Sequence, residues 1–195
     1  MMSFQTLIVL CGAYLIGSVP TGFIVAQLAG IPDIRLHGSG NSGATNVARV
    51  LGKKFFALVL LLDAGKAFGY LFSASFMGAS YEVLCLSALA LLLGNSVSLF
   101  LRFGGGKGVA TTVGALAYFS PSLMFCAFGI WVSVLIMLRN VGIASVCAAI
   151  SLIIIALSIL YKQNDPTALT IVSMAVWVIF LHRKNIEKYL NPRLD

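Results

Sequence analysis

Residues 109–138 read VATTVGALAYFSPSLMFCAFGIWVSVLIML and contain no charged side chain in thirty positions. A single helix of that length would measure about 45 Å at 1.5 Å per residue, well beyond the hydrocarbon core of a bilayer. Ser120-Pro121 therefore predicts a break, which leaves a short segment at 109–119 and a full span at 122–138. The short segment cannot cross a membrane alone, so the glycine-rich stretch before it would have to contribute at membrane depth.

The composition places the whole chain in the membrane class. Of its 195 residues, 59% are hydrophobic and 10% are charged, whereas soluble domains are about a quarter charged. The formal charge is +7, from 13 Lys and Arg against 6 Asp and Glu. The basic residues fall between apolar runs, so we expect no nucleic-acid partner. They indicate membrane topology first, and an anionic substrate or anionic lipid headgroups second.

Five further apolar runs complete a predicted all-α integral membrane fold, a single polytopic domain over residues 1–195. The first run is interrupted by Gly17–Gly22, which predicts a kink whose freed backbone groups are satisfied inside a bundle. No Lys or Arg precedes Arg35, so this run lacks the basic start of a cleaved signal peptide and indicates a retained helix. The five runs cover residues 4–29, 55–76, 83–101, 140–161 and 167–181.

Charge distribution decides between six and seven transmembrane helices. With seven and the N-terminus outside, Lys162 is the single basic residue outside, Lys66 lies within a span, and the C-terminus is cytoplasmic. With six, Arg139 and the basic tail would lie outside, against the positive-inside rule. We therefore expect seven helices. The cytoplasmic segments are then 30–54, 102–108, 139–140 and 182–195, with Arg35, Arg49, Lys53, Lys54, Arg102, Lys107, Arg139, Arg183, Lys184, Lys188 and Arg193.

The cysteines give no sign of a metal centre or a disulfide framework. Each lies alone in an apolar run, without a C-x-x-C pair or metal-ligand spacing. We expect them to be small hydrophobic side chains in helices, and we expect neither a metal nor a cofactor. They are Cys11, Cys85, Cys126 and Cys147.

The first polar motif covers residues 36–49, LHGSGNSGATNVAR. Its glycines let the backbone approach a ligand closely, and their N–H groups join the Ser, Thr and Asn side chains in a donor set suited to phosphate. Arg49 would add a bidentate, permanently charged clamp. The glycine spacing fits a dinucleotide-binding fingerprint, but no βαβ unit can be built between membrane spans. A flexible polar connector is the alternative. The candidate ligands are Ser39, Gly40, Asn41, Thr45, Asn46 and Arg49.

The second motif covers residues 102–112, RFGGGKGVATT. Four glycines around Lys107 at the start of a helix combine exposed N–H groups, a positive helix end and a mobile cation, as in a P-loop. It is not a Walker A motif, because glycine follows Lys107 and no strand precedes it. An ordinary basic loop would explain the lysine but not the four glycines. The candidate ligands are Gly105, Gly106, Lys107, Gly108 and Thr111.

A third motif, HRKNI at residues 182–186, follows the last span. In a continuing helix, His182 and Asn185 share a face at i, i+3. A histidine at a membrane boundary is often only interfacial, so this motif alone carries less weight than the two glycine-rich loops.

Three charged residues and a serine are weaker candidates. Asp63 and Lys66 lie three residues apart inside the second span, where ionisable residues are costly and usually paired or functional; a structural pair is favoured. Arg139, with Ser145 a turn or two beyond it, is a candidate contributor to the same cytoplasmic site, although the local sequence shows no pattern.

Together these motifs resemble the acyl-phosphate-dependent glycerol-3-phosphate acyltransferase family of bacterial membranes. The resemblance runs over nearly the whole chain, with the motifs in the family's order and spacing. It rests on Gly17-Ser18-Val19-Pro20, Ser39 to Asn46 with Arg49, Asp63 with Lys66, Gly105 to Thr111, and His182-x-x-Asn185-Ile186.

The resemblance implies seven spanning helices in the bacterial plasma membrane and an active site on the cytoplasmic side. It implies transfer of a fatty acyl group from acyl phosphate to glycerol 3-phosphate, giving 1-acyl-glycerol 3-phosphate and phosphate, the first step of phospholipid synthesis. Ser39, Arg49 and Lys107 with the adjoining glycines would contact phosphate, and His182 and Asn185 would complete the pocket. Membrane lipids and the soluble enzyme that makes acyl phosphate are candidate partners.

The chain departs from the family pattern at five positions. These changes remove one titratable group and one cation, so they bear on the strength of phosphate binding more than on the reaction type. The family has His at Asn95, Pro at Ser98, a basic residue at Gly104, Gly at Ala67 and Ser near Gly142.

Acyl phosphate is already a mixed anhydride, so no protein nucleophile is required and we expect direct transfer. The enzyme must hold two anions, orient the glycerol hydroxyl and stabilise the departing phosphate. His182 would either accept the hydroxyl proton or orient a phosphate. Three alternatives stay open: a small-anion transporter, although no internal repeat is seen; a serine hydrolase using Ser39 with His182, which leaves Lys107 without a role; and a non-catalytic relative.

Overall fold

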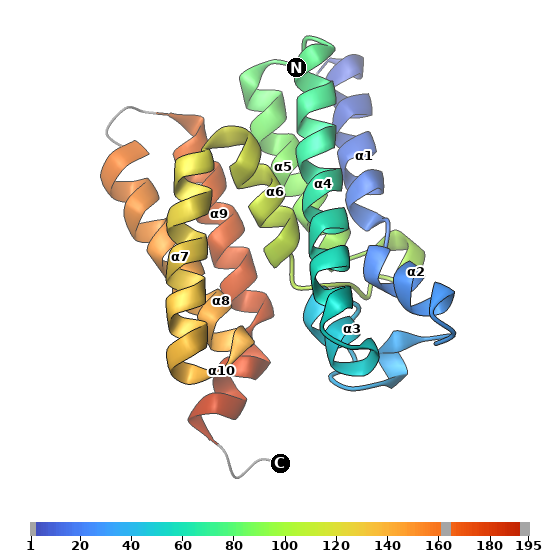
Figure 1. The fold of residues 1–195 in the computed structure, drawn as a ribbon. Helices are drawn as coiled ribbons and strands as arrows, with labels where there is room; N and C mark the ends of the chain where they lie inside the picture. The colour runs from blue at the N-terminus through green and yellow to red at the C-terminus, as the bar shows by residue number, and fades with distance from the viewer. Residues whose placement is uncertain (1–2, 161–164, 192–195) are drawn as a thin grey trace. The chain divides into compact units, whose positions relative to one another are not determined.

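The computed structural model describes residues 3–160 and 165–191, and within these ranges it contains helices and no strand (Figure 1). The chain divides into two compact units, Met1–Tyr118 (unit 1) and Phe119–Asp195 (unit 2). The all-helical expectation is confirmed for the described residues. That residues 1–195 form a single domain stays a prediction.

Ser120-Pro121 separates two helices, as the sequence predicts. α6 (Val109–Phe119) precedes this break and α7 (Pro121–Leu138) follows it. Pro121 is the first residue of α7. Proline suits this position because its missing N–H would have no partner in the first helical turn.

Three long helices form the body of unit 1: α1 (Phe4–Ser18), α4 (Lys54–Phe76) and α5 (Tyr81–Ser96) (Figure 1). α1 and α5 come into backbone contact because both carry glycine where they cross. A Cβ atom on Gly17 would overlap the Leu91 carbonyl, and one on Gly94 would overlap the Tyr14 carbonyl. Glycine at such crossings lets helices pack in lipid, where the hydrophobic effect gives little driving force for association.

The first membrane run is broken at Val19-Pro20 into α1 and α2 (Thr21–Leu28), which confirms the predicted interruption. Two side chains bind carbonyl groups that the break leaves available. Lys66 Nζ donates to the Val19 oxygen at 2.7 Å, and Ser98 Oγ donates to the Ser18 oxygen at 2.6 Å. Interior side chains thus replace helical hydrogen bonds, as the membrane interior requires.

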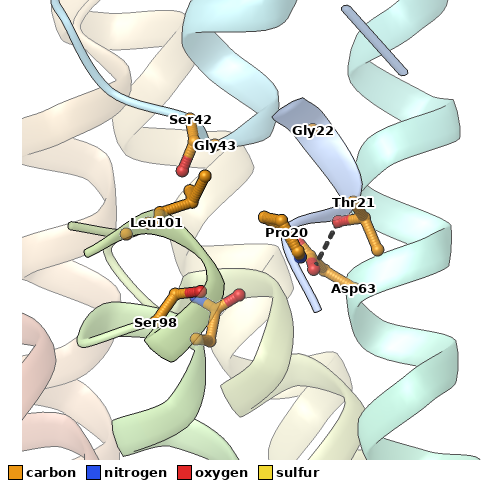
Figure 2. A pocket seen from close by; sticks show the side chains of 11 residues that line it. Pro20, Thr21, Gly22, Ser42, Gly43, Asp63, Ser98 and Leu101 are labelled. Carbon is orange, nitrogen blue, oxygen red and sulfur yellow. Dashed lines mark hydrogen bonds between the residues drawn. The ribbon is translucent and has the colours of Figure 1, made fainter. Parts of the chain in front are cut away.

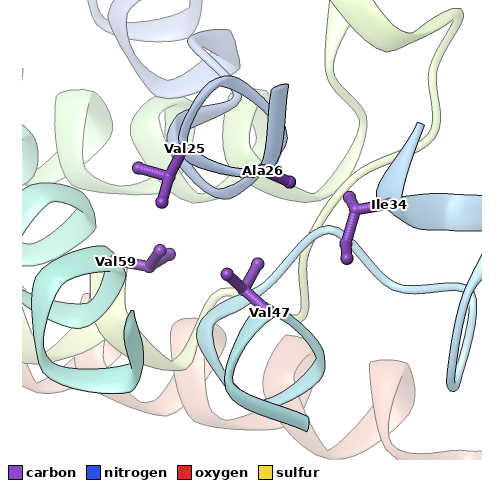
Figure 3. Close-up of a cluster of buried hydrophobic side chains, with 5 residues drawn as sticks. All are labelled: Val25, Ala26, Ile34, Val47 and Val59. Atoms are coloured by element: carbon purple, nitrogen blue, oxygen red, sulfur yellow. The ribbon is translucent and has the colours of Figure 1, made fainter. Parts of the chain in front are cut away.

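An apolar cluster anchors the end of unit 1 that carries the polar loops. α2, η1 (Ile34–Leu36), α3 (Ala44–Leu51) and α4 all contribute to it (Figure 3). The loop 37–43 runs between η1 and α3, so both of its ends are fixed by buried apolar side chains. The cluster comprises Val25, Ala26, Ile34, Val47 and Val59.

Between α5 and α6 the chain passes through η2 (Leu99–Leu101) and the second glycine-rich loop. Arg102 and Phe103 follow η2 with φ values of 54° and 63°. These values lie in the left-handed region, which residues other than glycine seldom enter because of steric conflict at Cβ. A strained pair of residues therefore directly precedes the glycines.

Unit 2 contains α7, α8 (Val141–Ile155), the π-helical η3 (Ala156–Leu160), α9 (Pro166–Leu181) and α10 (Arg183–Leu190) (Figure 1). α8 packs against both α7 and α9. The Asn140 side chain caps α8 by accepting from the Ile143 amide at 3.1 Å. At His182 the chain bends by 52° from α9 into α10.

Among the described residues, five helical stretches are long and apolar enough to cross a membrane, or six if the bent pair α9–α10 counts as one. α6 has 11 residues and is therefore about 16 Å long, too short to qualify alone. Seven spans and the terminal orientation stay predictions, and Lys162 lies outside the described residues. The five are Phe4–Leu28, Lys54–Phe76, Tyr81–Leu101, Pro121–Leu138 and Val141–Ser158.

The spanning helices carry large apolar side chains on their outer faces. Phe72, Phe125 and Leu169 are each more than half exposed. A soluble monomer seldom presents so much apolar surface to water. Helices that face lipid are expected to present it.

Candidate active site

Asn46 organises the first polar loop from a fully buried position in α3. Its side-chain oxygen accepts from the Ser39 amide at 2.7 Å and from Arg49 Nη1 at 3.2 Å. Its amide nitrogen donates to the His37 carbonyl at 2.9 Å and to the Ile34 carbonyl at 3.4 Å. These four bonds use the full capacity of the amide. We therefore assign Asn46 to shaping the loop and orienting Arg49, in place of the direct phosphate contact that the sequence predicts.

Glycine is required at Gly38 in this loop. Its φ is +62°, and a Cβ atom there would overlap the Asn46 side-chain oxygen. Only glycine allows the backbone to lie so close to the Asn46 amide. The Ser39 and Arg49 side chains are exposed and available to a ligand, and Thr45 is half-buried in the first turn of α3.

The second loop is fixed to the end of α5. The Gly106 amide donates to the Asn95 carbonyl at 2.9 Å, and a Cβ atom on Gly105 would overlap the Asn95 and Ser96 carbonyls. Gly108 has φ of +75° and directly precedes α6. The glycines therefore permit a close approach that places Lys107 beside the start of a helix.

Asn41 joins the two loops. Its oxygen accepts from the Gly43 amide at 2.8 Å, and its nitrogen donates to the Gly105 carbonyl at 3.2 Å. The structure thus brings together the two motifs that the sequence identified separately, although 64 positions separate Asn41 from Gly105.

Lys107 and Arg49 place two positive charges near each other. Burial lowers the pKa of the half-buried Lys107 ammonium below its usual value, and the charge of Arg49 lowers it further. Like charges repel, so this arrangement becomes more favourable when an anion lies beside both groups. The two loops of unit 1 therefore have the electrostatics of an anion site.

Asp63 and Lys66 form a buried ion pair at 2.7 Å, and Thr21 Oγ1 donates to Asp63 at 2.6 Å (Figure 2). Besides Val19, Lys66 also reaches the Asn95 side-chain oxygen, at 3.4 Å. Because Asn95 holds Gly106, the pair supports both the helix break and the second loop. These contacts favour the structural role that the sequence assigned to the pair.

A small polar cavity lies between these groups. Its volume is about 10 Å³, which is room for about one water molecule and not for a phosphorylated substrate. It reaches both loops, because Ser42 and Gly43 of the first loop and Gly105 and Gly106 of the second line it; Figure 2 shows the first two. The remaining lining residues are Pro20, Thr21, Gly22, Asp63, Asn95, Ser98 and Leu101.

Thr111 lies in the first turn of α6, directly after the second loop. Its side chain is completely buried, and within residues 3–160 and 165–191 its hydroxyl has no hydrogen-bond partner. The neighbouring Thr112 hydroxyl instead donates to the Gly108 carbonyl at 3.0 Å. The expected phosphate contact of Thr111 stays a prediction.

The other expected site residues lie in unit 2. His182 is buried at the bend between α9 and α10, and its Nδ1 lies 2.8 Å from the Val178 carbonyl. Because a carbonyl only accepts, Nδ1 carries a proton and Nε2 is the acceptor nitrogen in the neutral ring. The Ser145 hydroxyl is buried, donates to the Val141 carbonyl at 2.9 Å and accepts from Trp131 Nε1 at 3.2 Å.

Asn185 meets α8 at Gly142. A Cβ atom on Gly142 would lie 2.5 Å from the Asn185 amide nitrogen, so glycine is needed for this contact. Gly142 and Ser145 are three residues apart on one face of α8. Gly142 thus links Asn185 of α10 to the first turn of α8, one turn before Ser145. Arg139 is exposed in the turn before α8, with a left-handed φ of 50°.

Sequence reasoning missed Arg35, counting it only as a cytoplasmic charge. It contacts Asp33 at 2.7 Å and donates to the Leu101 carbonyl at 3.1 Å. The spacing Asp33-x-Arg35 just before the first loop could have indicated the ion pair. Nothing in the local sequence indicates the contact with Leu101.

These features define a class: an all-helical membrane protein with a candidate anion site built from two glycine-rich loops. The glycerol-3-phosphate acyltransferase family model matches residues 7–192. The glycerol-3-phosphate acyltransferase of Synechococcus sp. (strain JA-2-3B'a(2-13)) is 40% identical over 96% of this chain and 94% of its own. That of Aquifex aeolicus (strain VF5) is 39% identical over 93% of each chain.

Solved structures give the same result. A crystal structure of PlsY (YgiH), an integral membrane glycerol 3-phosphate acyltransferase, in its glycerol 3-phosphate form is similar with a TM-score of 0.87. It shares 37% identity over 97% of this chain and 94% of its own. The lysophosphatidic acid form is similar with a TM-score of 0.85 and 36% identity, over 97% of this chain and 93% of its own. This chain belongs to the glycerol-3-phosphate acyltransferase family, and it is an integral membrane acyltransferase of lipid biosynthesis.

Proposed function

We propose that this chain transfers a fatty acyl group from acyl phosphate to glycerol 3-phosphate, forming 1-acyl-glycerol 3-phosphate and inorganic phosphate. The observation that carries the proposal is the placement of Lys107 and Arg49 within electrostatic reach of each other on two joined glycine-rich loops. Both substrates are phosphate anions. Family membership supports an acyltransferase over an anion transporter or a serine hydrolase.

The reaction needs positioning more than covalent catalysis. The glycerol hydroxyl oxygen forms a bond to the acyl carbon, the bond from that carbon to the phosphate oxygen breaks, and the hydroxyl proton passes to a base or to the leaving phosphate. Ser39, Arg49, Lys107 and the loop amides would hold the phosphates and stabilise the charge on the leaving group. No acyl-enzyme is required.

His182 has two roles open to it in this scheme. With Nδ1–H directed to the Val178 carbonyl, the Nε2 lone pair can accept the hydroxyl proton, or Nε2 can hydrogen-bond a protonated group. The carbonyl bond fixes the orientation of the ring in either case. Asn185 and Ser145 are the further substrate-binding residues of this proposal.

The proposal includes a location. We place the protein in the bacterial plasma membrane with seven spans, the N-terminus outside and the active site on the cytoplasmic side. The excess of basic residues in the segments that carry the glycine-rich loops supports this orientation. The soluble enzyme that makes acyl phosphate would then deliver acyl phosphate on the same side. The 1-acyl-glycerol 3-phosphate would pass into the surrounding membrane lipids.

The decisive experiment uses purified protein in lipid nanodiscs with acyl phosphate and glycerol 3-phosphate. We expect equimolar lysophosphatidic acid and phosphate, measured by mass spectrometry and a phosphate assay. The acyl-coenzyme A and acyl-carrier-protein thioesters should not replace acyl phosphate. Lys53→Gln serves as the matched control for the variants below that remove a positive charge, because Lys53 is exposed and outside both loops. Product formed equally well from a thioester would reject the acyl-phosphate donor while leaving the family intact.

Initial-rate kinetics test the direct transfer. Double-reciprocal plots against the two substrates should intersect, because both must be bound together. Parallel lines, with an acyl adduct on Ser39 or His182 after incubation with acyl phosphate alone, would instead indicate an acyl-enzyme.

A further inference from the structure

The segment 101–105 carries a strained turn at the entrance of the second loop. Arg102 and Phe103 both adopt left-handed φ values although each has a Cβ atom. Such a conformation persists only where surrounding contacts impose it. The carbonyl of Ser98, which caps η2, accepts from the Phe103 amide at 2.7 Å. The Gly104 amide also donates to the Leu101 carbonyl at 3.2 Å, and the Gly106 amide donates to the Asn95 carbonyl at 2.9 Å, so backbone bonds from this part of the chain reach both ends of the turn.

Side chains from η1 and from the first loop add support on both sides of the turn. Arg35 Nη1 donates to the Leu101 carbonyl at 3.1 Å, just before the strained pair. Asn41 Nδ2 donates to the Gly105 carbonyl at 3.2 Å, just after it. One donor comes from η1 and the other from the first loop, and the two acceptors bracket the same turn, so contacts from an earlier part of the chain hold the turn on both sides.

Arg35 is itself held rigidly. Its Nε and Nη2 bind both carboxylate oxygens of Asp33, at 2.7 to 3.2 Å, and the Asp33 carboxylate also accepts from the Arg35 amide at 2.9 Å. The guanidinium lies over the Phe23 ring, 5.5 Å from its centroid. Because Nε, Nη2 and the face of the guanidinium are all in contact with neighbours, Nη1 has a defined direction toward the Leu101 carbonyl. A lysine ammonium could not bind Asp33 in this bidentate way and reach Leu101 as well.

We propose that Arg35 is a positioning residue, which holds the left-handed turn at Arg102–Phe103 and thereby sets Gly105–Lys107 at the phosphate of glycerol 3-phosphate. The role rests on the proposed function of the two loops. Arg35 acts through the Leu101 carbonyl and does not itself contact the reacting atoms. Its effect should therefore appear mainly as weaker binding of glycerol 3-phosphate.

The test compares Arg35→Gln and Arg35→Lys with wild type, in nanodiscs, by kcat and KM for glycerol 3-phosphate. We expect both to lower kcat/KM about 10- to 100-fold, mainly through KM, since loss of positioning has effects of that size. Lys53→Gln, which also removes one exposed positive charge from unit 1, should leave both parameters within about twofold. An unchanged kcat/KM in Arg35→Gln overturns the proposal.

Rescue separates positioning from general destabilisation. Phe103→Gly should restore most of the kcat/KM of Arg35→Gln, because glycine adopts a positive φ without support. Phe103→Ala is the matched control: it also removes the ring, but it keeps the Cβ atom and the strain, and it should restore nothing. Equal behaviour of the glycine and alanine variants in the Arg35→Gln background overturns the strained-turn role.

A binding measurement keeps this inference distinct from the proposed reaction. Thermal stabilisation by glycerol 3-phosphate alone reports its affinity without any acyl donor. Wild type should be stabilised at concentrations at which Arg35→Gln is not. If wild type binds glycerol 3-phosphate but does not use acyl phosphate, the proposed donor fails and the role of Arg35 stands. If wild type is active and Arg35→Gln binds equally well, only the role of Arg35 fails.

Discussion

Asn41 donates its side-chain amide to the backbone carbonyl of Gly105 at 3.2 Å, so one polar side chain fixes the distance between the two glycine-rich loops. The same side chain accepts from the Gly43 amide at 2.8 Å, which orders the chain just before α3. Its two contacts involve opposite ends of one amide. Substitutions can therefore remove one contact and keep the other.

Asn41→Asp should keep the contact to Gly43 and lose the contact to Gly105, because a carboxylate accepts but does not donate. It would also face the Gly105 carbonyl with a negative charge. We expect kcat/KM for glycerol 3-phosphate to fall by more than about tenfold, and further than in Asn41→Ala. Steady-state kinetics in nanodiscs would measure this. An aspartate variant more active than the alanine variant would contradict the role assigned to the Gly105 contact.

Lys107→Ala should cost at least about 2 kcal/mol in kcat/KM, through loss of a charge-assisted contact to phosphate. Arg49→Lys should also be damaging, since a point charge cannot reproduce the planar guanidinium fork. Phosphate-release kinetics of both variants, beside Lys53→Gln as control, would measure the losses. Near-normal activity in both would remove the anion-site argument.

The pKa of Lys107 predicts an alkaline limit on binding. Burial and the charge of Arg49 lower this pKa, so the cation is lost at a lower pH than for an ordinary lysine. As pH rises through the lowered pKa, kcat/KM should fall. A bound phosphate has the opposite charge and should raise the pKa again. The same shift disfavours folding while Lys107 is protonated, and this cost fades as pH rises from the folded-state to the unfolded-state pKa.

Amine labelling of Lys107 against pH, followed by peptide mass spectrometry, would measure the effect. The midpoint should rise when phosphate is added and when Arg49 is replaced by Gln, because each change favours the protonated amine. A midpoint that responds to neither would show that Lys107 does not share a site with Arg49 or with phosphate.

Cysteine labelling in a background without native cysteines tests the seven-span topology. Lys184→Cys should react only from the cytoplasmic side. Ser122→Cys, exposed just after the break, should react only from outside if α6 completes a crossing with its glycine-rich loop. A cysteine near Asn164 should also react from outside, although that position lies beyond the described residues. Labelling of Lys184→Cys and Ser122→Cys from the same side would reject seven spans.

Gly142→Ala should displace Asn185, because the new methyl group would lie 2.5 Å from its amide nitrogen. We expect a loss of kcat/KM of about tenfold with little change in expression, since α10 lies at the end of unit 2. Asn185→Ala should cost as much, and the double variant no more than either single one. Additive losses in this cycle would show that Gly142 and Asn185 act independently.

The sequence predicted features that depend on local chemistry. Proline marked the breaks at Val19-Pro20 and Ser120-Pro121, and both lie where the structure has them. The i, i+3 spacing of Asp63 and Lys66 predicted a pair on one helix face, and they form an ion pair. Composition predicted a membrane protein, and the comparison with an integral membrane acyltransferase confirms it.

Features that depend on distant contacts could not be predicted. Arg35 and Leu101 are 66 positions apart, and no local pattern indicates their contact. Asn46 is identified as a polar residue in a glycine-rich motif, but only the fold reveals that its amide is fully used inside the loop. The complete burial of Thr111 is likewise revealed only by the fold.

The glycine-lined crossing of α1 and α5 has a practical consequence for handling the protein. Gly17 and Gly94 let two backbones touch, and this contact depends on shape complementarity between surfaces. Small detergent molecules can compete for such a surface much more readily than bilayer lipids. α1 ends at the helix break that Lys66 binds. Separation of α1 from α5 would therefore weaken the contacts that support the two loops. We therefore expect activity to survive extraction into nanodiscs or long-chain maltosides and to decay in short-chain detergents before the helices themselves unfold.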